Sequence, residues 1–249
     1  MPLRTHLPTI CLIDTGLTPG DYAPGVIAGG INLSGCGEPQ SLAPAGSRHG
    51  DAMAGTLLAH CPQARLVNLK LLDENGWLLD AGRLDAAFAW VVAQRAALGI
   101  TVVCAAVADA SHHAHDAPFQ ETPLSRMIAL LRAAGVPTVM PAGNSYPQFR
   151  LREPHGMAWP AILRDVVSVA ALDAADPQRL HRYSQRLPAL AGAACATTLH
   201  LVPGPPGQTS GAAAVAAGRL AQLRAAFPDA DVSALVALLR ADAWQTLPP

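Results

Sequence analysis

The sequence predicts an α/β fold, a doubly wound and mostly parallel sheet with helices on both faces. Short apolar runs of strand length alternate along the chain with segments of helical periodicity, which is the pattern of a parallel sheet. Of the 249 residues, 51% are hydrophobic, enough for one sizeable core, and no linker or internal repeat divides the chain. We therefore expect the whole chain, residues 1–249, to form a single domain.

The first half of the chain begins with TICLID (9–14), an apolar run that predicts a buried strand ending in an acid. A weaker strand is expected at 26–33. Apolar residues at helical spacing predict a helix at 49–61, and ARLVNLKLL predicts a strand at 64–72. An amphipathic helix follows at 80–98.

The second half repeats this alternation. A buried strand is expected at 100–108, a helix with a glycine stop at 122–135, and a strand running into a Gly-Asn loop at 137–144. Another strand is expected at 165–172, and the region near 188–203 resembles a hairpin. The chain closes with two predicted helices, at 209–226 and 231–242.

The charge balance excludes several classes of partner. The chain has 17 basic and 18 acidic residues, a formal net charge of -1, so it offers no basic surface for nucleic acid or an anionic membrane. The longest uncharged stretch, 187–207, contains Pro188, Gly192 and His200, and is therefore no membrane helix. Only 14% of residues are charged. The surface is therefore rich in small uncharged residues, or a partner subunit covers part of it.

Cysteine usage indicates a reducing compartment. The five cysteines are an odd number; Cys11 and Cys104 lie in predicted buried strands, and Cys36, Cys61 and Cys195 show no CxxC spacing. Reduced thiols fit a cytoplasmic location. The apolar run near the N-terminus is too short for a secretory signal, which also favours the cytoplasm.

Four short motifs carry polar groups that suit nucleophilic catalysis. Asp14 in CLIDTG ends a predicted strand, and His49 in RHGDAMAG begins a predicted helix. Asn144 in MPAGNS follows a strand, and Ser210 in GQTSGAAAVAAG begins a helix of very small residues. A serine there lies at the positive end of the helix dipole, beside free N–H groups that can hold an oxyanion. Taken singly, each residue is an ordinary turn or cap residue. Together they supply a nucleophile, a base, an orienting acid and an oxyanion donor.

In the order Asp, His, Asn, Ser, these motifs resemble those of the subtilisin-like serine proteases, the subtilases. The resemblance runs from about residue 9 to about residue 242, and 159–173 also looks like the family's aromatic-Pro-Ala segment. The matching residues, by motif, are Asp14, Thr15 and Gly16; His49, Gly50, Ala54 and Gly55; Ala142, Gly143 and Asn144; and Thr209, Ser210 and Ala212.

The resemblance implies a role for each polar residue. Ser210 is expected to be the nucleophile and His49 its general base and later general acid. Asp14 would orient the imidazole, and Asn144 would hold the oxyanion with the Ser210 N–H. The implied activity is a serine endopeptidase that forms an acyl-enzyme and needs no cofactor.

The resemblance also implies an uncharged pocket for the residue before the scissile bond, which favours a small or medium apolar side chain there. Its expected walls lie within 106–108, 142–144 and 158–160. The residues expected to contact substrate are Ala106, Val107, Ala108, Ala142, Gly143 and Ala158. Ala108 stands where the family usually has glycine, so a narrower cleft is expected.

Three further departures surround the serine. Gln208 replaces a family glycine, Gly211 a methionine and Ala214 a proline. They leave a second interpretation open, a pseudoprotease that binds peptides without cleaving them. A third is a transpeptidase or macrocyclase, in which an amine accepts the acyl group in place of water.

Metal binding has one candidate, the loop DASHHAHDA at 109–117. His112, His113 and His115 with two aspartates are metal-ligand types, but their spacing is not that of a fixed site, so we expect a polar loop and no metal. The family's calcium loop after the histidine helix has no counterpart in the sequence, and little chain precedes the first strand. We therefore expect folding without calcium or a pro-segment, and a dedicated peptide or protein substrate.

Overall fold

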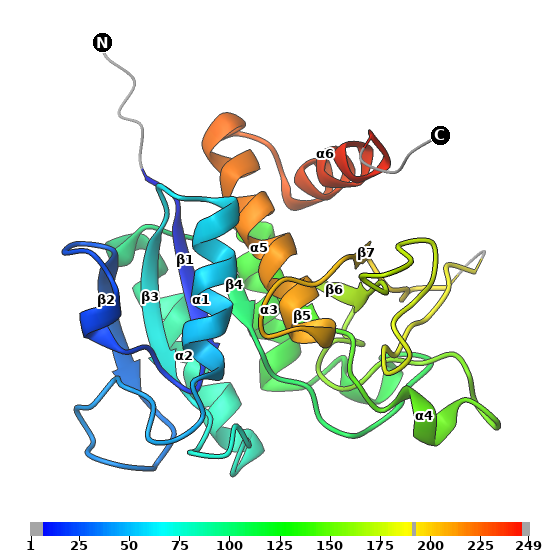
Figure 1. Cartoon of the computed structure of the whole chain (residues 1–249), viewed down its shortest axis with the longest axis horizontal. Helices are drawn as coiled ribbons and strands as arrows, with labels where there is room; N and C mark the ends of the chain where they lie inside the picture. Colours follow the sequence, from blue (N-terminus) through cyan, green and yellow to red (C-terminus); the bar gives the residue numbers. More distant parts are fainter. Residues whose placement is uncertain (1–6, 191–192, 246–249) are drawn as a thin grey trace.

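The computed structural model describes residues 7–190 and 193–245 (Figure 1). In this part of the chain, seven parallel strands form one sheet in the order β2-β3-β1-β4-β5-β6-β7, which confirms the predicted fold class. The strands are β1 (Thr9–Asp14), β2 (Ile27–Asn32), β3 (Arg65–Lys70), β4 (Ile100–Ala105), β5 (Thr138–Pro141), β6 (Val166–Ala171) and β7 (Leu199–Leu201).

The helices follow the predicted segments within a few residues, and a short helix, α4, was not predicted. Helix α2 begins where the Asp80 carboxylate accepts a hydrogen bond from Gly82 N, and it ends at Gly99, whose φ of 64° is the left-handed conformation of a helix stop. The helices are α1 (His49–His60), α2 (Ala81–Leu98), α3 (Pro123–Ala133), α4 (Tyr146–Phe149), α5 (Gln208–Ala226) and α6 (Val232–Gln245).

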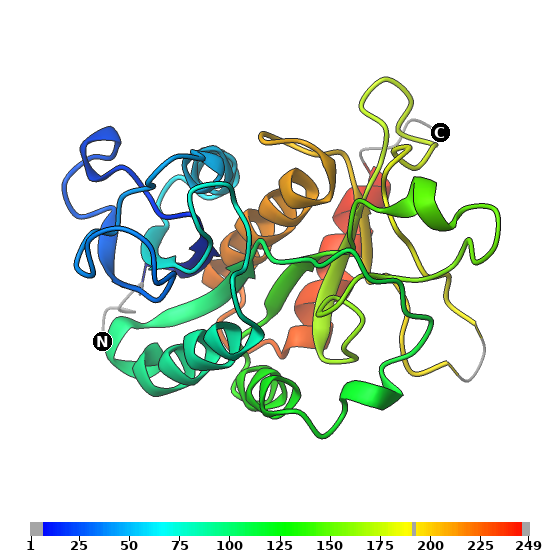
Figure 2. The same ribbon diagram turned by 90° about the horizontal axis from the view of Figure 1, so that it is seen from below.

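Side chains that alternate along the strands build two cores. Ile10 and Leu12 of β1 pack with the helices α1, α5 and α6, whereas Cys11 and Ile13 pack with α2 and α3. Figure 2 shows α2 and α3 on one side of the sheet, with α1 and α5 on the other. Both faces of every central strand are therefore buried, which is why these strands are continuous apolar runs.

Helix α5 crosses the middle of one sheet face and lies beside α1 (Figure 1). Its small residues are required by close contacts. A Cβ on Gly218 would lie 2.8 Å from His60 Cβ and 2.9 Å from Leu57 O, and a Cβ on Gly211 would lie 1.9 Å from Gly204 O. The absence of large side chains therefore lets α5 approach both α1 and the loop before it.

Two sequence predictions were wrong in detail. Strand β4 ends at Ala105, not at residue 108, because the neighbouring strands β1 and β5 also end near this level and the chain turns away. The expected hairpin near 188–203 is not formed by the described residues of that segment. Instead Leu199–Leu201 adds to the sheet edge parallel to β6, where its backbone finds hydrogen-bond partners.

No helix in the described ranges is both long and apolar enough to cross a membrane.

We predict that Gly218→Ala lowers the free energy of unfolding by about 1–3 kcal/mol, because its new methyl group would meet backbone of α1 that cannot move aside. The matched control is Gly55→Ala on α1, where nothing lies within 4 Å of the added Cβ. That control should raise stability by roughly 0.5–1 kcal/mol through helix propensity. Urea unfolding of both variants measures the difference, and equal effects would contradict the packing argument.

Candidate active site

Strand β1 and helix α1 bring Asp14 and His49 together. The Asp14 side chain is 1% exposed, and its two carboxylate oxygens lie 2.9 and 2.8 Å from His49 Nδ1. Thr15 N also donates to Asp14 Oδ1, at 2.7 Å. Because an ionised carboxylate only accepts hydrogen bonds, it holds the proton on Nδ1 and leaves Nε2 as the basic nitrogen of neutral His49.

The two motifs that carry these residues interlock through backbone. Gly50 N donates to Thr15 Oγ1 at 3.0 Å, and a Cβ on Gly50 would lie 2.3 Å from Gly16 O. Gly16 itself has a φ of 104°, and a Cβ there would lie 2.5 Å from Leu42 O. Glycine is therefore needed at both positions for α1 to start against the end of β1.

Asp51 fastens the same helix to the loop after β1. It accepts hydrogen bonds from Thr18 N (2.8 Å), Thr18 Oγ1 (2.7 Å), Tyr22 Oη (2.9 Å) and Arg48 Nε (2.8 Å). Burial acts to raise the pKa of the Asp51 carboxyl, but these hydrogen bonds outweigh it and lower that pKa. The ionised side chain of Asp51 therefore fixes the first turn of α1, which carries His49, to the loop after β1.

Ser210 lies in the first turn of α5, which packs on α1. The two helices approach closely at Gly218 and Leu57, which lie eight residues beyond Ser210 and His49 respectively. Within the described residues no hydrogen bond joins Ser210 to His49, a looseness common in unliganded sites.

The side chain of Asn144 follows β5 and is oriented by Thr209, the residue before the serine. Thr209 donates to Asn144 Oδ1 from its Oγ1 at 2.8 Å and from its backbone N at 3.2 Å. Thr209 is fully buried, so this contact is shielded from water. Both bonds use the amide oxygen, which turns the Nδ2 donor of Asn144 away from Thr209 and leaves it available to an oxyanion.

The electrostatics of His49 suit a base near neutral pH. Burial acts to lower the pKa of the imidazole, but the hydrogen bond and negative charge of Asp14 outweigh it, so the pKa of His49 lies above its ordinary value. Its side chain is 27% exposed, so Nε2 can be reached from solvent.

A comparison with known families matches residues 7–247 to the subtilase family. The chain belongs to the subtilase family. It is a serine protease of the subtilisin-like class. A comparison with curated protein sequences gives no match.

Solved structures agree with this fold. Sphericase superposes with a TM-score of 0.69 at 19% identity, covering 94% of this chain and 84% of its own. A cold-adapted subtilisin-like serine proteinase gives a TM-score of 0.69 at 16% identity, covering 96% of this chain and 83% of its own. A lanthipeptide protease gives a TM-score of 0.66 at 18% identity, covering 94% of this chain and 80% of its own. At these identities the likeness concerns the fold alone.

The departures from the usual subtilase serine motif have physical consequences. Gln208 has a φ of 52°, a left-handed conformation that glycine adopts freely and that strains a residue with a side chain. Gly211 lies against Gly204 O, where a larger residue has no space. Ala214 is buried inside α5 and keeps a backbone N–H that proline would lack.

The expected substrate contacts lie on three segments, two of which are joined by a hydrogen bond. Ala142 and Ala158 are fully buried, and Ala158 N donates to Ala142 O at 2.9 Å. On the third segment, Val107 is nearly buried and Ala108 is exposed. The remaining two expected contacts are Ala106, whose N donates to Ile13 O at 3.0 Å, and Gly143, next to Asn144.

The histidine loop uses its rings for other contacts. His112 Nε2 lies 2.6 Å from Glu153 O, and its ring stacks on Phe149. His113 packs edge-on against Phe119. Among the described residues, no three His, Cys, Asp or Glu side chains converge as a metal site.

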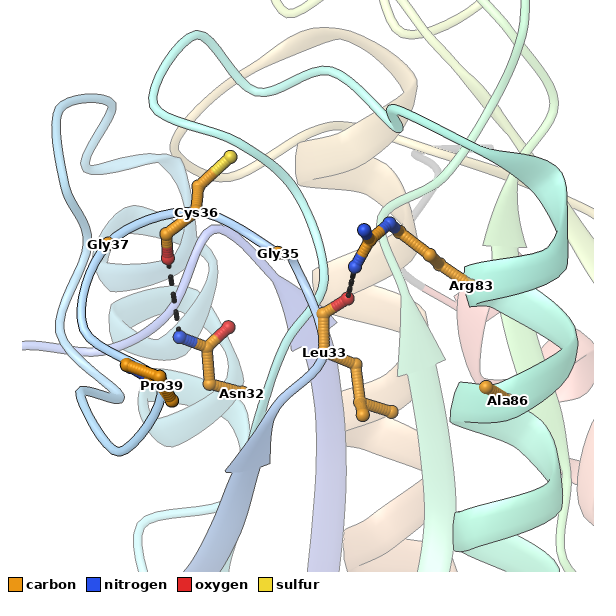
Figure 3. Close-up of a pocket in the computed structure, with 8 residues that line it drawn as sticks. All are labelled: Asn32, Leu33, Gly35, Cys36, Gly37, Pro39, Arg83 and Ala86. Atoms are coloured by element: carbon orange, nitrogen blue, oxygen red, sulfur yellow. Dashed lines mark hydrogen bonds between the residues drawn. The ribbon is translucent and has the colours of Figure 1, made fainter.

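A cavity of about 290 Å³ lies between the end of β2 and the start of α2 (Figure 3). Arg83 Nη1 donates to Leu33 O at 3.0 Å, and a Cβ on Gly35 would lie 2.5 Å from the same guanidinium. Figure 3 shows the Cys36 sulfur pointing away from Asn32. Since no candidate catalytic residue of this subtilase lines the cavity, Arg83 serves there to brace the loop.

Sequence reasoning missed Thr209 and Asp51 as parts of the site. Both stand next to a motif residue, but their partners Asn144 and Thr18 are distant in the chain. A clue was present at Asp51, a carboxylate in the first turn of a helix, where the dipole favours negative charge.

We predict that kcat/KM of this subtilase rises with pH through an apparent pKa above about 6.5, because the free base is needed and Asp14 raises the pKa of His49. Asp14→Asn should shift this limb to lower pH and reduce kcat on the order of 10⁴-fold. The pH profile of each protein measures both effects. The matched control is Glu121→Gln, which neutralises an exposed carboxylate remote from the site.

The same raised pKa has a consequence for stability. A group whose folded pKa is raised contributes fully below its unfolded pKa, and the contribution is lost as pH rises through the folded pKa. The thermal unfolding midpoint of the wild type, relative to that of Asp14→Asn, should therefore fall as the pH rises through the pKa of His49 in the folded protein.

The activity measurement can contradict the assignment of His49. It would do so if the rising part of the kcat/KM profile stays at the same pH in Asp14→Asn.

Proposed function

We propose that this subtilase is an endopeptidase that cleaves a peptide bond through Ser210, His49 and Asp14. The observation that carries the proposal is the hydrogen bond from His49 to the buried Asp14, at the start of a helix packed beside the helix of Ser210. An acid, a base and a hydroxyl in this relation are what nucleophilic catalysis requires.

In the proposed reaction, His49 Nε2 takes the proton from Ser210 Oγ as that oxygen attacks the substrate carbonyl carbon. The carbonyl oxygen becomes negative and accepts hydrogen bonds from Asn144 Nδ2 and Ser210 N. The C–N bond then breaks, and His49 returns its proton to the leaving amine. Water, activated by the same nitrogen, releases the acyl group and restores Ser210.

A groove near the start of α5 is our candidate for the leaving side of the peptide. It has a volume of about 830 Å³ and runs along residues 203–208, and its opposite wall carries His181 and Arg182. Because neither Gly143 nor Ala158 lines this groove, we assign it to the residues that follow the scissile bond. On the other side we assign Ala106, Val107, Ala108 and Gly143 to the residue before that bond, with the fully buried Ala142 and Ala158 as the support behind them.

An exposed aromatic side chain adds a candidate contact for the acyl side. Trp77 is 70% exposed, and its backbone N donates to Asp73 Oδ1 at 2.8 Å, which holds the loop in one conformation. A Cβ on the adjacent Gly76 would lie about 4 Å from both Thr15 and Ser47, which flank the residues Asp14 and His49. We assign Trp77 to substrate residues upstream of the cleaved bond.

We further propose a dedicated peptide or protein substrate in a reducing, cytoplasmic compartment. All five cysteines are free thiols, and burial raises the pKa of Cys195 to about 11, which keeps it protonated and unreactive. The narrower cleft expected from Ala108 also favours a selective enzyme over a degradative one.

We predict that a fluorophosphonate labels the wild-type protein covalently, and that Ser210→Ala abolishes labelling and lowers turnover by about a millionfold. The matched control is Ser233→Ala, which removes a serine from the first turn of another helix, α6. Intact-mass spectrometry reports the label, and a peptide library read by mass spectrometry reports cleavage.

Each result distinguishes the alternatives. Folded wild-type protein that resists the label would favour a pseudoprotease that binds peptides. Cyclic or ligated products in the library would favour transpeptidation or macrocyclisation. Labelling that persists in Ser210→Ala would remove Ser210 as the nucleophile.

We predict that Asn144→Ala lowers kcat by about 10²–10³-fold with little change in KM, because the lost hydrogen bond forms mainly in the transition state. Thr209→Val should lower kcat less and in the same direction, since Asn144 Oδ1 would lose its donor at 2.8 Å. Thr209→Ser keeps the hydroxyl and should restore most of the rate. A change confined to KM would instead make Asn144 a substrate-binding residue only.

A further inference from the structure

In the proposed function, with the pocket walls expected from the family resemblance, the side chain before the scissile bond is assigned to the backbone just before Asn144. That backbone is Gly143, whose φ is 109°. Ala158 lies against it, since a Cβ on Gly143 would be 2.7 Å from Ala158 Cβ. The inference that follows rests on the proposed function, because that function sets where the carbonyl lies.

The side chain of Gln185 lies against the same side of Gly143 as Ala158. Gln185 is 0% exposed, and its Oε1 would lie only 2.2 Å from a Cβ on Gly143. The same oxygen accepts a hydrogen bond from Ser145 N at 3.2 Å, and Gln185 N donates to Gly143 O at 2.9 Å. Gln185 is therefore bonded to the backbone on both sides of Asn144.

The other end of the Gln185 amide is held by the histidine loop. Nε2 lies 2.8 Å from Ser111 O and 2.9 Å from His112 Nδ1. The backbone oxygen of Glu153 can only accept a hydrogen bond, so His112 Nε2 must carry the proton. Nδ1 of the neutral ring then accepts a hydrogen bond from Gln185 Nε2. Burial lowers the pKa of His112, which favours this neutral form.

These contacts make Gln185 hard to displace. Both protons of its Nε2 and one lone pair of its Oε1 are used inside the protein, and swinging the side chain out would leave buried groups unpaired. His112 is held in turn by the ring of Phe149, and a Cβ on Gly156 would lie 2.6 Å from its imidazole. The support behind Gln185 is therefore closely packed.

We infer that Gln185, positioned by His112, closes the pocket for the residue before the scissile bond and restricts that residue to Gly, Ala or Ser. Ala142 and Ala158 add no room, since both are fully buried beneath this surface. A longer side chain would have to displace the Gln185 carboxamide from its hydrogen bonds. The substrate is then a peptide cleaved after a small residue.

The test uses two diphenyl phosphonate probes, succinyl-Ala-Ala-Pro-Ala and succinyl-Ala-Ala-Pro-Phe, which react with the nucleophile and differ only in the residue under study. We expect the wild type to react at least tenfold faster with the Ala probe. Gln185→Ala should raise the Phe-to-Ala ratio of rate constants at least tenfold. Gln148→Ala, an exposed glutamine on α4, is the matched control and should leave the ratio unchanged.

His112→Phe provides a second variant in case the buried truncation does not fold. It keeps the ring stacked on Phe149 but removes the acceptor for Gln185, so the ratio should move in the same direction by a smaller factor. A wild type that prefers the Phe probe, or an unchanged ratio in a folded variant, would overturn the role of Gln185. A wild type that also resists a simple fluorophosphonate would overturn the proposed function itself.

Discussion

The packing of α5 against α1 is the constraint on which the rest of the site depends. Gly218 allows the two helix backbones to approach until a methyl group would no longer fit between them. The first turns of these two helices carry the proposed nucleophile Ser210 and the proposed base His49. The thin Ala- and Gly-rich helix is thus a way to bring two helix N-termini to one edge of the sheet.

Buried hydrogen bonds hold the polar groups of this edge in place. Thr15 connects Asp14 to the start of α1, and Thr209 connects Asn144 to the start of α5. Groups fixed in this way need little rearrangement when charge develops in a reaction, which is the physical basis of electrostatic catalysis. Gln208 is the exception, because its left-handed backbone stores strain beside the serine.

The acyl side of the site depends on segments that lie far apart in the chain. Gln185 connects the strand end before Asn144 with the loop of Ser111 and His112. One of the histidines considered as metal ligands in the sequence, His112, therefore has a different part in the molecule, as the support of a buried amide. In our inference this support makes the pocket shallow and the enzyme selective.

The sequence by itself determined the strand and helix order, the ends of β1 and β5 where Asp14 and Asn144 lie, and the helix starts at His49 and Ser210, because these depend on local periodicity and on glycine positions. It did not predict that residues 199–201 join the sheet edge, or the roles of Asp51, Thr209 and Gln185. Those depend on partners dozens of residues away, whose distance no local pattern records. Only the tertiary structure decided them, because a buried polar side chain takes its role from the groups that folding brings within hydrogen-bond reach.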